Sequence, residues 1–439
     1  MYITGFGFLW FGINIVAFFM GNNALLKLML FSTMFQAAAV IIVGNYPINP
    51  LTITCMVYIV WYLIINKGKF IVTSQHLTFM CFLLYAFVQA IIAGFLFDGL
   101  TIYLGNGALE SEVFHGNISI GEFVSLFVYA IVLILLYNKQ SISRIEIERI
   151  IEFMTVILLV FGVWQHADYF GLIPRNNIVA QMLYSSRGVR EEHIAYYAYL
   201  RNNRSILGTR FYSTFMEPSY CGGFLGVLFC YYISKKNHMI KDKLLIVSIV
   251  LMGILTFSAT AYVGIAGGGF FSMLYLKNSD RLWKIVKRGI RIVTIGLIGI
   301  VVFNVWPVIN EKILRKSTSH SAYIRGAWNK NCLNVCKETC GFGIGLGAVR
   351  GSSILPTALA TVGVLGVLIY IAFLFNFIKR DTDDRNGGNN RYKALVATCI
   401  VALIISIPDF SYTILWFVLF IYMIDISIRY NVENKLSVV

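Results

Sequence analysis

The chain has 439 residues, of which 58% are hydrophobic and only 13% are charged, and its formal net charge is +15. This composition excludes an ordinary soluble globular protein. The positive charge does not indicate nucleic-acid binding, because no soluble basic domain is present to carry it. Most of that charge lies in short loops between apolar segments, where it sets membrane orientation and meets anionic headgroups.

Apolar runs recur along the whole chain, at about the 17–25 residues that a helix needs to cross ~30 Å of hydrocarbon. Because the runs are continuous and do not alternate, they predict helices and not a barrel. We expect an all-α fold, a polytopic integral membrane bundle of about 12–14 transmembrane helices that forms one domain over residues 1–439. The expected spans lie near 3–20, 26–43, 51–66, 76–97, 119–137, 149–170, 219–233, 241–258, 260–277, 289–309, 354–378, 393–408 and 411–428.

The basic loops predict the orientation of these spans. Lys67, the lysine cluster 235–243 and Arg429 fall on one face, which the positive-inside bias makes cytoplasmic. Two long loops, 171–218 and 310–353, then lie on the outer face, which is periplasmic in a bacterium with an outer membrane. This topology needs 241–277 to cross twice, with a turn near Ser258-Ala-Thr260. It also places the N-terminus outside, unless an early segment is re-entrant.

The first outer loop is distinguished by its cations. Residues 171–219 contain six arginines and no lysine, and the loop ends in Arg210-Phe-Tyr-Ser-Thr-Phe-Met-Glu217-Pro-Ser. A guanidinium grips phosphate or carboxylate with two parallel hydrogen bonds, which an ammonium cannot do. Arg201, Arg204 and Arg210 therefore indicate an anionic, phosphorylated substrate, with headgroup anchoring as the simpler alternative. Glu217 is a candidate general base; the alternative is a structural role at the start of the next helix, where Pro218 fits the first turn.

The second outer loop combines His320 and Arg325 with a glycine-rich run over 341–347 that is followed by Arg350. Alternating glycines let the backbone approach a ligand closely and can form an N–H nest for an anion. The alternative is a tight entry into the next helix. The residues 319–336 have a helical apolar face, and His320 by itself is typical of a protein surface.

The remaining polar clusters are weak evidence for a metal site or a disulfide. Cys332, Cys336 and Cys340 are four residues apart and share one helical face, so they fit helix packing or a disulfide better than a zinc site. Glu110 and Glu112 in the loop 98–118 could hold a metal, but acidic residues are common in such loops. We expect no metal and no cofactor.

Taken together, these features resemble the bacterial O-antigen polymerase (Wzy-type) family, within the O-antigen polymerase and ligase superfamily. The resemblance covers roughly residues 150–380. An outer loop runs through Arg210 into Glu217-Pro-Ser and a glycine-rich span, and a helix pair turns at Phe257-Ser-Ala-Thr260. A second outer loop carries Arg325 and then Gly-Ile-Gly-Leu-Gly.

Two spacings add detail to the resemblance. An arginine followed ten to fifteen residues later by glycine occurs in both loops of family members. Here Arg210 precedes Gly222 with eleven residues between, and Arg325 precedes Gly341 with fifteen. The related ligases have a histidine, a small polar residue, nine others and then glycine. His320-Ser321 begins this pattern, but position 331 is asparagine, which favours polymerase over ligase and puts a catalytic role of His320 in doubt.

The resemblance implies a polysaccharide polymerase, acting on O-antigen or capsule repeat units at the outer face of the bacterial cytoplasmic membrane. It would transfer a growing glycan from a polyprenyl-diphosphate carrier to the non-reducing end of an incoming lipid-linked repeat unit, without a metal. Arg210 and Arg325 would clamp the diphosphate, and Glu217 would position or deprotonate the attacking hydroxyl. The expected substrate-binding residues are Arg201, Arg204, His320, Tyr323 and Arg350.

The expected partners are the lipid-linked oligosaccharide, membrane lipids and, as a candidate, a chain-length regulator protein; no nucleic acid is expected. Three alternatives stay open. An O-antigen ligase would use another acceptor, and a lipid-linked oligosaccharide flippase or transporter would also be a basic bundle of helices. A metal-dependent glycosyltransferase would depend on Glu110.

Overall fold

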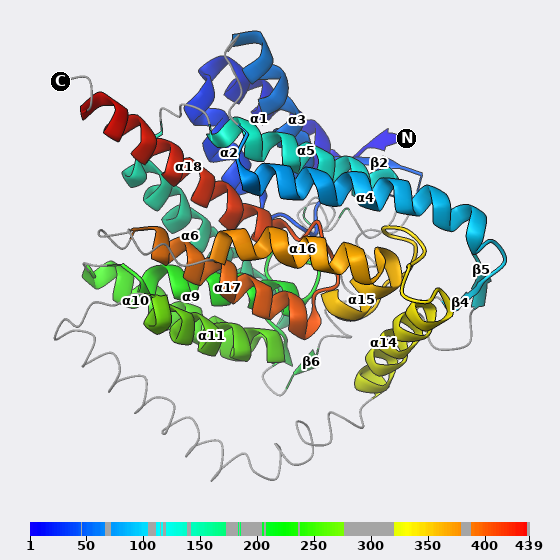
Figure 1. Cartoon of the computed structure of the whole chain (residues 1–439). Coiled ribbons are helices and arrows are strands. Elements are labelled where there is room, and N and C mark those ends of the chain that lie inside the picture. Colours follow the sequence, from blue (N-terminus) through cyan, green and yellow to red (C-terminus); the bar gives the residue numbers. More distant parts are fainter. Residues whose placement is uncertain are drawn as a thin grey trace.

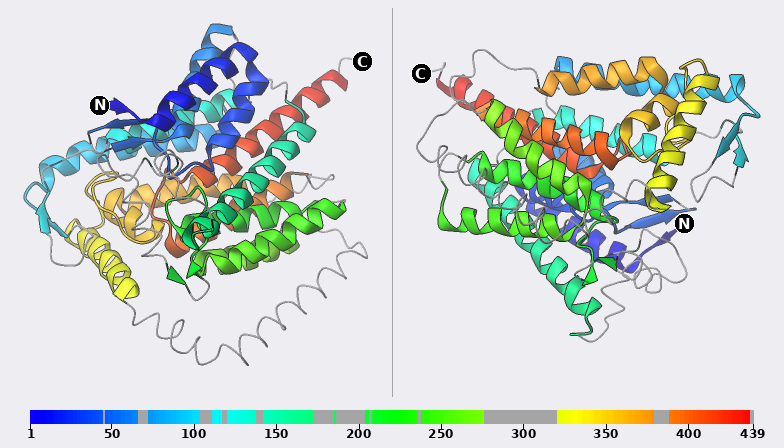
Figure 2. Two further views of the ribbon diagram at one scale, coloured as in Figure 1. Left: turned by 180° about the vertical axis from the view of Figure 1, so that it is seen from behind. Right: turned by 90° about the horizontal axis from the view of Figure 1, so that it is seen from below.

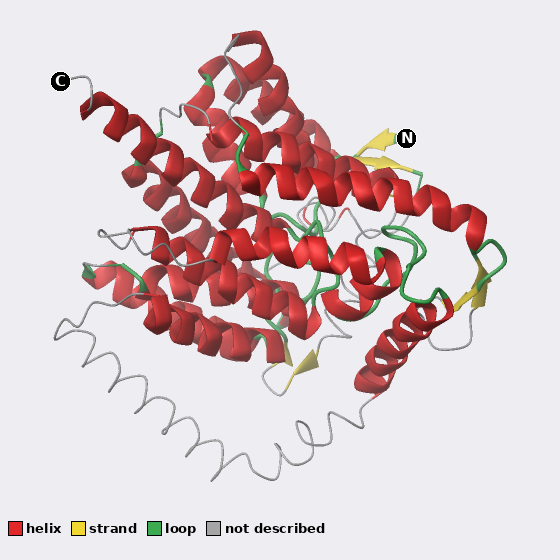
Figure 3. Ribbon diagram, in the orientation of Figure 1, coloured by secondary structure: helices red, strands yellow, loops and turns green. Residues whose placement is uncertain are grey.

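The computed structural model describes residues 1–44, 46–65, 72–103, 111–114, 116, 120–137, 142–172, 183, 185, 204–205, 208–235, 238–275, 320–378 and 388–436. Fourteen helices lie in this part of the chain, so the predicted all-α class is confirmed (Figure 3). Their bounds are α1 Gly5–Met20, α2 Asn22–Ser32, α3 Pro50–Ile65, α4 Ser74–Leu96, α5 Ile120–Tyr137, α6 Arg144–Tyr169, α9 Pro218–Ile233, α10 Ile240–Leu255, α11 Ala259–Tyr275, α14 His320–Glu338, α15 Ile354–Thr361, α16 Gly363–Ile378, α17 Gly388–Ser406 and α18 Thr413–Leu436.

Short antiparallel strands join some of the helices. A three-stranded sheet has the order β1-β2-β3, and it pairs Tyr2 with Ile42 and Ile42 with Pro47. Because β1 precedes α1 and β2 follows α2, the hairpin of α1 and α2 begins and ends at the same side of the bundle. The strands are β1 Tyr2–Ile3, β2 Ile41–Val43, β3 Tyr46–Ile48, β4 Thr101–Tyr103, β5 Ser111–Val113, β6 Arg204–Ser205 and β7 Gly208–Thr209.

Most helices run back and forth across one bundle (Figures 1 and 2). The C-terminal ends of α16 and α18 and the N-terminal ends of α10 and α17 gather on the left of Figure 1, and β4, β5, α14 and α15 lie on the right. We call the left side the basic end, because Lys235, which follows α9, and Lys241 and Lys243 in the first turn of α10 lie there, and the right side the loop end. The turn between α10 and α11 spans 256–258, as the sequence predicts.

An especially close helix contact joins α9 and α11, and α17 packs against both. Each of the first two helices carries glycines four residues apart, Gly222 and Gly226 in α9 and Gly264 and Gly268 in α11. A Cβ built on Gly226 would lie 2.7 Å from the carbonyl carbon of Gly264, and one on Gly268 would lie 2.9 Å from the carbonyl oxygen of Gly226. Such pairs of small residues let two helix backbones touch, as in membrane helix dimers.

Two predicted spans differ from the structure. The expected span 26–43 is wrong, because α2 ends at Ser32 and the chain continues into β2 at Ile41. The hydroxyl of Thr33 donates to the Leu30 carbonyl at this end, and pairing with β1 and β3 satisfies the backbone of β2. The span 354–378 is broken into α15 and α16 at Gly363, whose φ is +68°. The expected span 289–309 lies outside the described residues.

Two described helices, α4 and α5, are both long and apolar enough to cross a membrane. Five others are apolar but shorter, among them α1, α3 and α9, each with 16 residues. At 1.5 Å per residue such a helix is about 24 Å long, slightly less than the ~30 Å of a hydrocarbon core. The number of membrane spans therefore stays a prediction.

Candidate functional site

Four polar side chains meet at the loop end, where the chain around residue 350 approaches the start of α9. Nη2 of Arg350 donates to Oη of Tyr220 at 2.7 Å and to Oδ2 of Asp409 at 3.1 Å. The hydroxyl of Tyr220 also donates to Oδ2 of Asp409. Glu217, three residues before Tyr220, is close enough to interact electrostatically with both Tyr220 and Arg350. We call Arg350, Tyr220, Asp409 and Glu217 the Arg350 cluster.

The start of α9 and the turn between α17 and α18 position the residues of the Arg350 cluster. Pro218 occupies the first turn of α9, as predicted, and Glu217 is the N-cap residue but makes no capping hydrogen bond with its side chain. The Glu217 carboxylate instead accepts a hydrogen bond from Ser219 Oγ at 3.3 Å. Pro408-Asp409 lies in the turn between α17 and α18, and Tyr412 Oη ties this turn to α9 by donating to the Tyr220 carbonyl at 3.1 Å.

The backbone after Arg350 is fixed from two sides. The N–H of Gly351 donates to Thr357 Oγ1 at 3.0 Å, and the N–H of Ser352 donates to Asn329 Oδ1 at 2.8 Å. The guanidinium itself is open to ligands, because the Arg350 side chain is 63% exposed, whereas that of Asp409 is 27% exposed. The neighbouring carboxylate of Asp409 raises the pKa of Arg350, so the guanidinium keeps its charge.

A further carboxylate, Glu122 in the first turn of α5, faces the cluster and interacts electrostatically with Asp409 and Arg350. Tyr46 of β3 packs beside it, since a Cβ on Gly121 would collide with the Tyr46 ring at 2.2 Å. Burial, and secondarily the charge of Glu122, raises the pKa of Tyr46 to about 12, so this phenol stays protonated. Three carboxylates therefore surround one exposed guanidinium.

The glycine run 341–347 serves packing. The backbone N–H groups of residues 341–345 all donate within the protein, including Ile344 to the Ala360 carbonyl and Gly345 to the Thr361 carbonyl. A Cβ on Gly343 would lie 2.5 Å from the Thr361 carbonyl oxygen, which explains the need for glycine. These five N–H groups therefore do not form the predicted anion nest, and the alternative, a tight entry into the following helices, is what the structure shows.

Arg210 is bound by backbone carbonyls of the turn between α10 and α11. Its Nε donates to the Thr256 carbonyl and its Nη2 to the Phe257 carbonyl, both at 2.9 Å. These carbonyls follow the C-terminus of α10, where helical acceptors lack partners, and Phe257 has a φ of +46°. Arg210 thus stabilises the turn between α10 and α11.

We expect Arg210→Ala to lower the free energy of unfolding by about 2 kcal/mol, because two charge-assisted hydrogen bonds are lost and two carbonyls lose their donor. The thermal unfolding midpoint of the purified protein in detergent measures this loss. A variant that unfolds like the wild type but no longer extends glycan would instead support the clamp predicted from the sequence.

The other predicted residues are not brought together by the described structure. Arg201 lies outside the described residues, Arg204 lies in β6, and His320 is the first residue of α14. Tyr323 is 68% exposed, and Arg325 makes no hydrogen bond or ion pair within the described part of the chain. Since α14 packs against α15 and β4, whereas Arg210 adjoins the turn between α10 and α11, the two proposed clamp arginines have different neighbours.

Sequence reasoning missed Tyr220 and Asp409. A signal for Asp409 was present: it is a single carboxylate at the boundary between two apolar runs, where a charge is costly unless it has a partner. For Tyr220, the sequence held no evidence of a functional role other than its position three residues after Glu217. Of the predicted residues, the structure joins Arg350 and Glu217 to one site.

Within the described residues, no group of three or more histidines, cysteines and acids could hold a metal ion. Glu110 lies outside the described residues, and the side chain of Glu112 is not described. Cys332, Cys336 and Cys340 are free thiols, and Cys332 is fully buried, as helix packing predicts.

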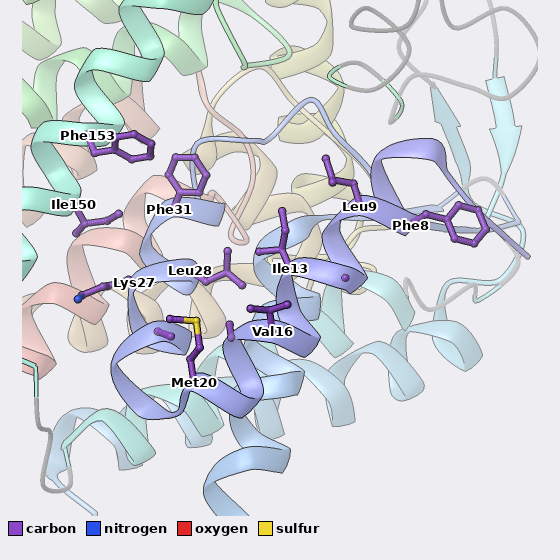
Figure 4. A pocket seen from close by; sticks show the side chains of 13 residues that line it. Phe8, Leu9, Ile13, Val16, Met20, Lys27, Leu28, Phe31, Ile150 and Phe153 are labelled. Carbon is purple, nitrogen blue, oxygen red and sulfur yellow. The ribbon is translucent and has the colours of Figure 1, made fainter.

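Two cavities of the described structure differ in the polarity of their linings. The larger, of about 620 Å³, lies between α1, α2 and α6 and is lined almost wholly by apolar side chains, with Lys27 at one end and Phe8 at the other (Figure 4). Lys27 pairs there with Glu146 at 2.6 Å. The smaller cavity, of about 120 Å³, is polar and includes Asp409 of the Arg350 cluster. Of these two cavities, the smaller is therefore the one that suits a polar ligand.

No protein-family model matches this chain, and no curated protein matches it by sequence.

Proposed function

We propose that the protein is a membrane-embedded glycosyltransferase that joins lipid-linked oligosaccharide repeat units at its loop end. The substrate would be a saccharide on a polyprenyl diphosphate, and the product a longer glycan on the same kind of carrier. The observation that carries the proposal is the Arg350 cluster, in which an exposed guanidinium lies among carboxylates at one end of an apolar bundle.

The chemistry follows from the roles of these groups. The bond between the sugar C1 and the diphosphate oxygen breaks, and Arg350 stabilises the negative charge that develops on the leaving diphosphate. The acceptor hydroxyl oxygen forms the new bond to C1, and its proton passes to the Glu217 carboxylate, which acts as general base. Asp409 and Tyr220 hold Arg350 in place through Nη2, so the guanidinium needs no reorganisation during the reaction.

Membrane embedding is supported by the exposed surface. Helix α16 exposes Val364, Leu368, Ile371 and Phe375, which lie on one helical face, and α4 exposes Leu84, Val88, Ile91 and Phe95 in the same way. Apolar faces of this extent are rare on proteins that stay in water.

The charges are arranged as expected for such a protein. Ion pairs cluster toward the basic end, where Lys235 and Arg391 share Glu148 and Lys241 pairs with Glu152 at 2.7 Å. The Arg350–Asp409 pair lies beside the start of α9 and after the end of α17, whereas Lys235 and Arg391 lie at the other ends of these two helices. This separation favours a cytoplasmic basic end and a catalytic loop end on the outer side.

An O-antigen ligase would use the same cluster with another acceptor, so assays with that acceptor separate the two enzymes. A flippase would move the lipid-linked unit across the bilayer and leave its glycan length unchanged. The proposal of a polymerase predicts chain extension in proteoliposomes that contain only the purified protein and the lipid-linked repeat unit.

We expect Glu217→Gln to reduce chain extension about a hundredfold or more, because the amide cannot accept the proton of the attacking hydroxyl. The variant should fold normally, since Glu217 makes no capping hydrogen bond. The measurement is the glycan length distribution in proteoliposomes, with Glu152→Gln at the basic end as the matched control. Normal chain length in Glu217→Gln would show that this carboxylate has no catalytic role.

A further inference from the structure

The small polar cavity next to the Arg350 cluster has the chemistry of a carbohydrate subsite. Its polar lining includes Gln36, Asn49, Asp409, Ser411, Tyr412 and Thr413. These residues come from the segment after α2, from the segment after β3, and from the turn between α17 and α18 together with the first residue of α18. They meet only in the folded protein.

Three polar groups of this cavity have unused hydrogen-bonding capacity. Oε1 of Gln36 is buried and has no hydrogen-bond partner among the described residues. Oδ1 of Asn49 accepts from the Thr52 N–H and hydroxyl and from Tyr129 Oη, at 2.9–3.4 Å, so its Nδ2 is the group left to donate. Asp409 contacts Tyr220 and Arg350 through Oδ2, which leaves Oδ1 as an acceptor.

The cavity thus offers one donor, Asn49 Nδ2, and two acceptors, Gln36 Oε1 and Asp409 Oδ1, with the Ser411 hydroxyl beside them. Two neighbouring hydroxyls of a sugar ring match this set, because each can donate one hydrogen bond and accept others. An anionic ligand fits less well, because the Asp409 carboxylate lines the cavity and the Arg350 guanidinium does not. At ~30 Å³ per water molecule, 120 Å³ corresponds to about four waters, which is room for one edge of a sugar ring.

We propose that this cavity binds the hydroxyl-bearing edge of the acceptor sugar, with Asn49 donating and with Gln36 and Asp409 accepting. The inference rests on the proposed function and deepens it, because it places the acceptor on one side of Asp409 and the diphosphate of the donor on the other, at the exposed face of Arg350. Asn49 and Gln36 are then positioning residues that set acceptor affinity.

Two near-isosteric changes test the subsite. Asn49→Asp keeps Oδ1 for Thr52 and Tyr129 but removes the Nδ2 donor, and Gln36→Met removes the unpartnered acceptor without adding charge. Each is expected to raise the half-saturating concentration of the lipid-linked repeat unit about tenfold, the factor for one lost hydrogen bond, while the maximal rate stays near that of the wild type. Gln36→Met, which adds no charge, should also keep the unfolding midpoint of the wild type. Unchanged half-saturation in both variants would overturn the inference.

A binding measurement separates this inference from the proposed function. Ser411→Cys introduces a thiol into the cavity, in a background in which the exposed Cys81 and Cys340 are replaced by serine. The probe is the free saccharide released from the lipid-linked pool by mild acid, which lacks both lipid and diphosphate. It should slow methanethiosulfonate labelling of the introduced thiol at least fivefold, and in the same protein with Gln36→Met the protection should weaken.

The outcomes are distinguishable. If the saccharide protects the introduced thiol but the protein does not extend glycan, the acceptor subsite is supported and the proposed polymerase function is contradicted. If the wild type extends glycan but the saccharide does not protect the introduced thiol, the proposed polymerase function is supported and the acceptor subsite is contradicted.

Discussion

Arg350→Ala is expected to lower the rate of chain extension about a thousandfold, the upper range for removing one group that stabilises developing negative charge. The side chain is 63% exposed, so its removal should cost little stability. Arg350→Lys should recover only part of the activity, because an ammonium cannot reproduce the fork that contacts Tyr220, Asp409 and a diphosphate together. The rate is measured in proteoliposomes with the lipid-linked repeat unit.

Lys330→Ala is the matched control, since it removes an exposed cation from the same loop end without touching the cluster. Wild-type glycan length in cells that carry Arg350→Ala would remove the basis of the proposed function. Full activity in Arg350→Lys would show that charge alone is needed.

Gly226→Ala is expected to destabilise the protein by about 3 kcal/mol, near the upper range for overpacking a close contact. Its Cβ would meet three backbone atoms of Gly264 at 2.7–2.9 Å, so α9 and α11 must move apart. Both helices contact α17, and the displaced α9 also carries Tyr220 at its start. The variant should therefore lose activity together with stability, which distinguishes it from Arg350→Ala.

Gly267→Ala is the control for Gly226→Ala, because it adds the same methyl group to α11 where the nearest atom is 3.8 Å away. Unfolding midpoints of the two variants in detergent measure the difference. Equal midpoints would mean that α9 and α11 do not rely on their direct backbone contact.

Much of the local structure was readable from the sequence. Continuous apolar runs predicted the helices, and Ser258 marked the turn between α10 and α11 correctly. Pro218 marked the start of α9 because its missing N–H is harmless in a first turn. The span 26–43 failed, because an apolar run does not reveal whether strand pairing satisfies its backbone.

The amino-acid sequence alone determined where most helices form and which polar residues lie at their ends. Only the tertiary structure decided which of these groups share a site. Arg210 and Arg350 are equally charged in the sequence, but the first is committed to backbone carbonyls and the second is held open beside Asp409. Asp409 and Tyr220 are 189 residues apart, and their pairing depends on how α9 packs against α17 and α18. Contacts over such separations leave no periodic trace in the chain, because they are set by packing geometry.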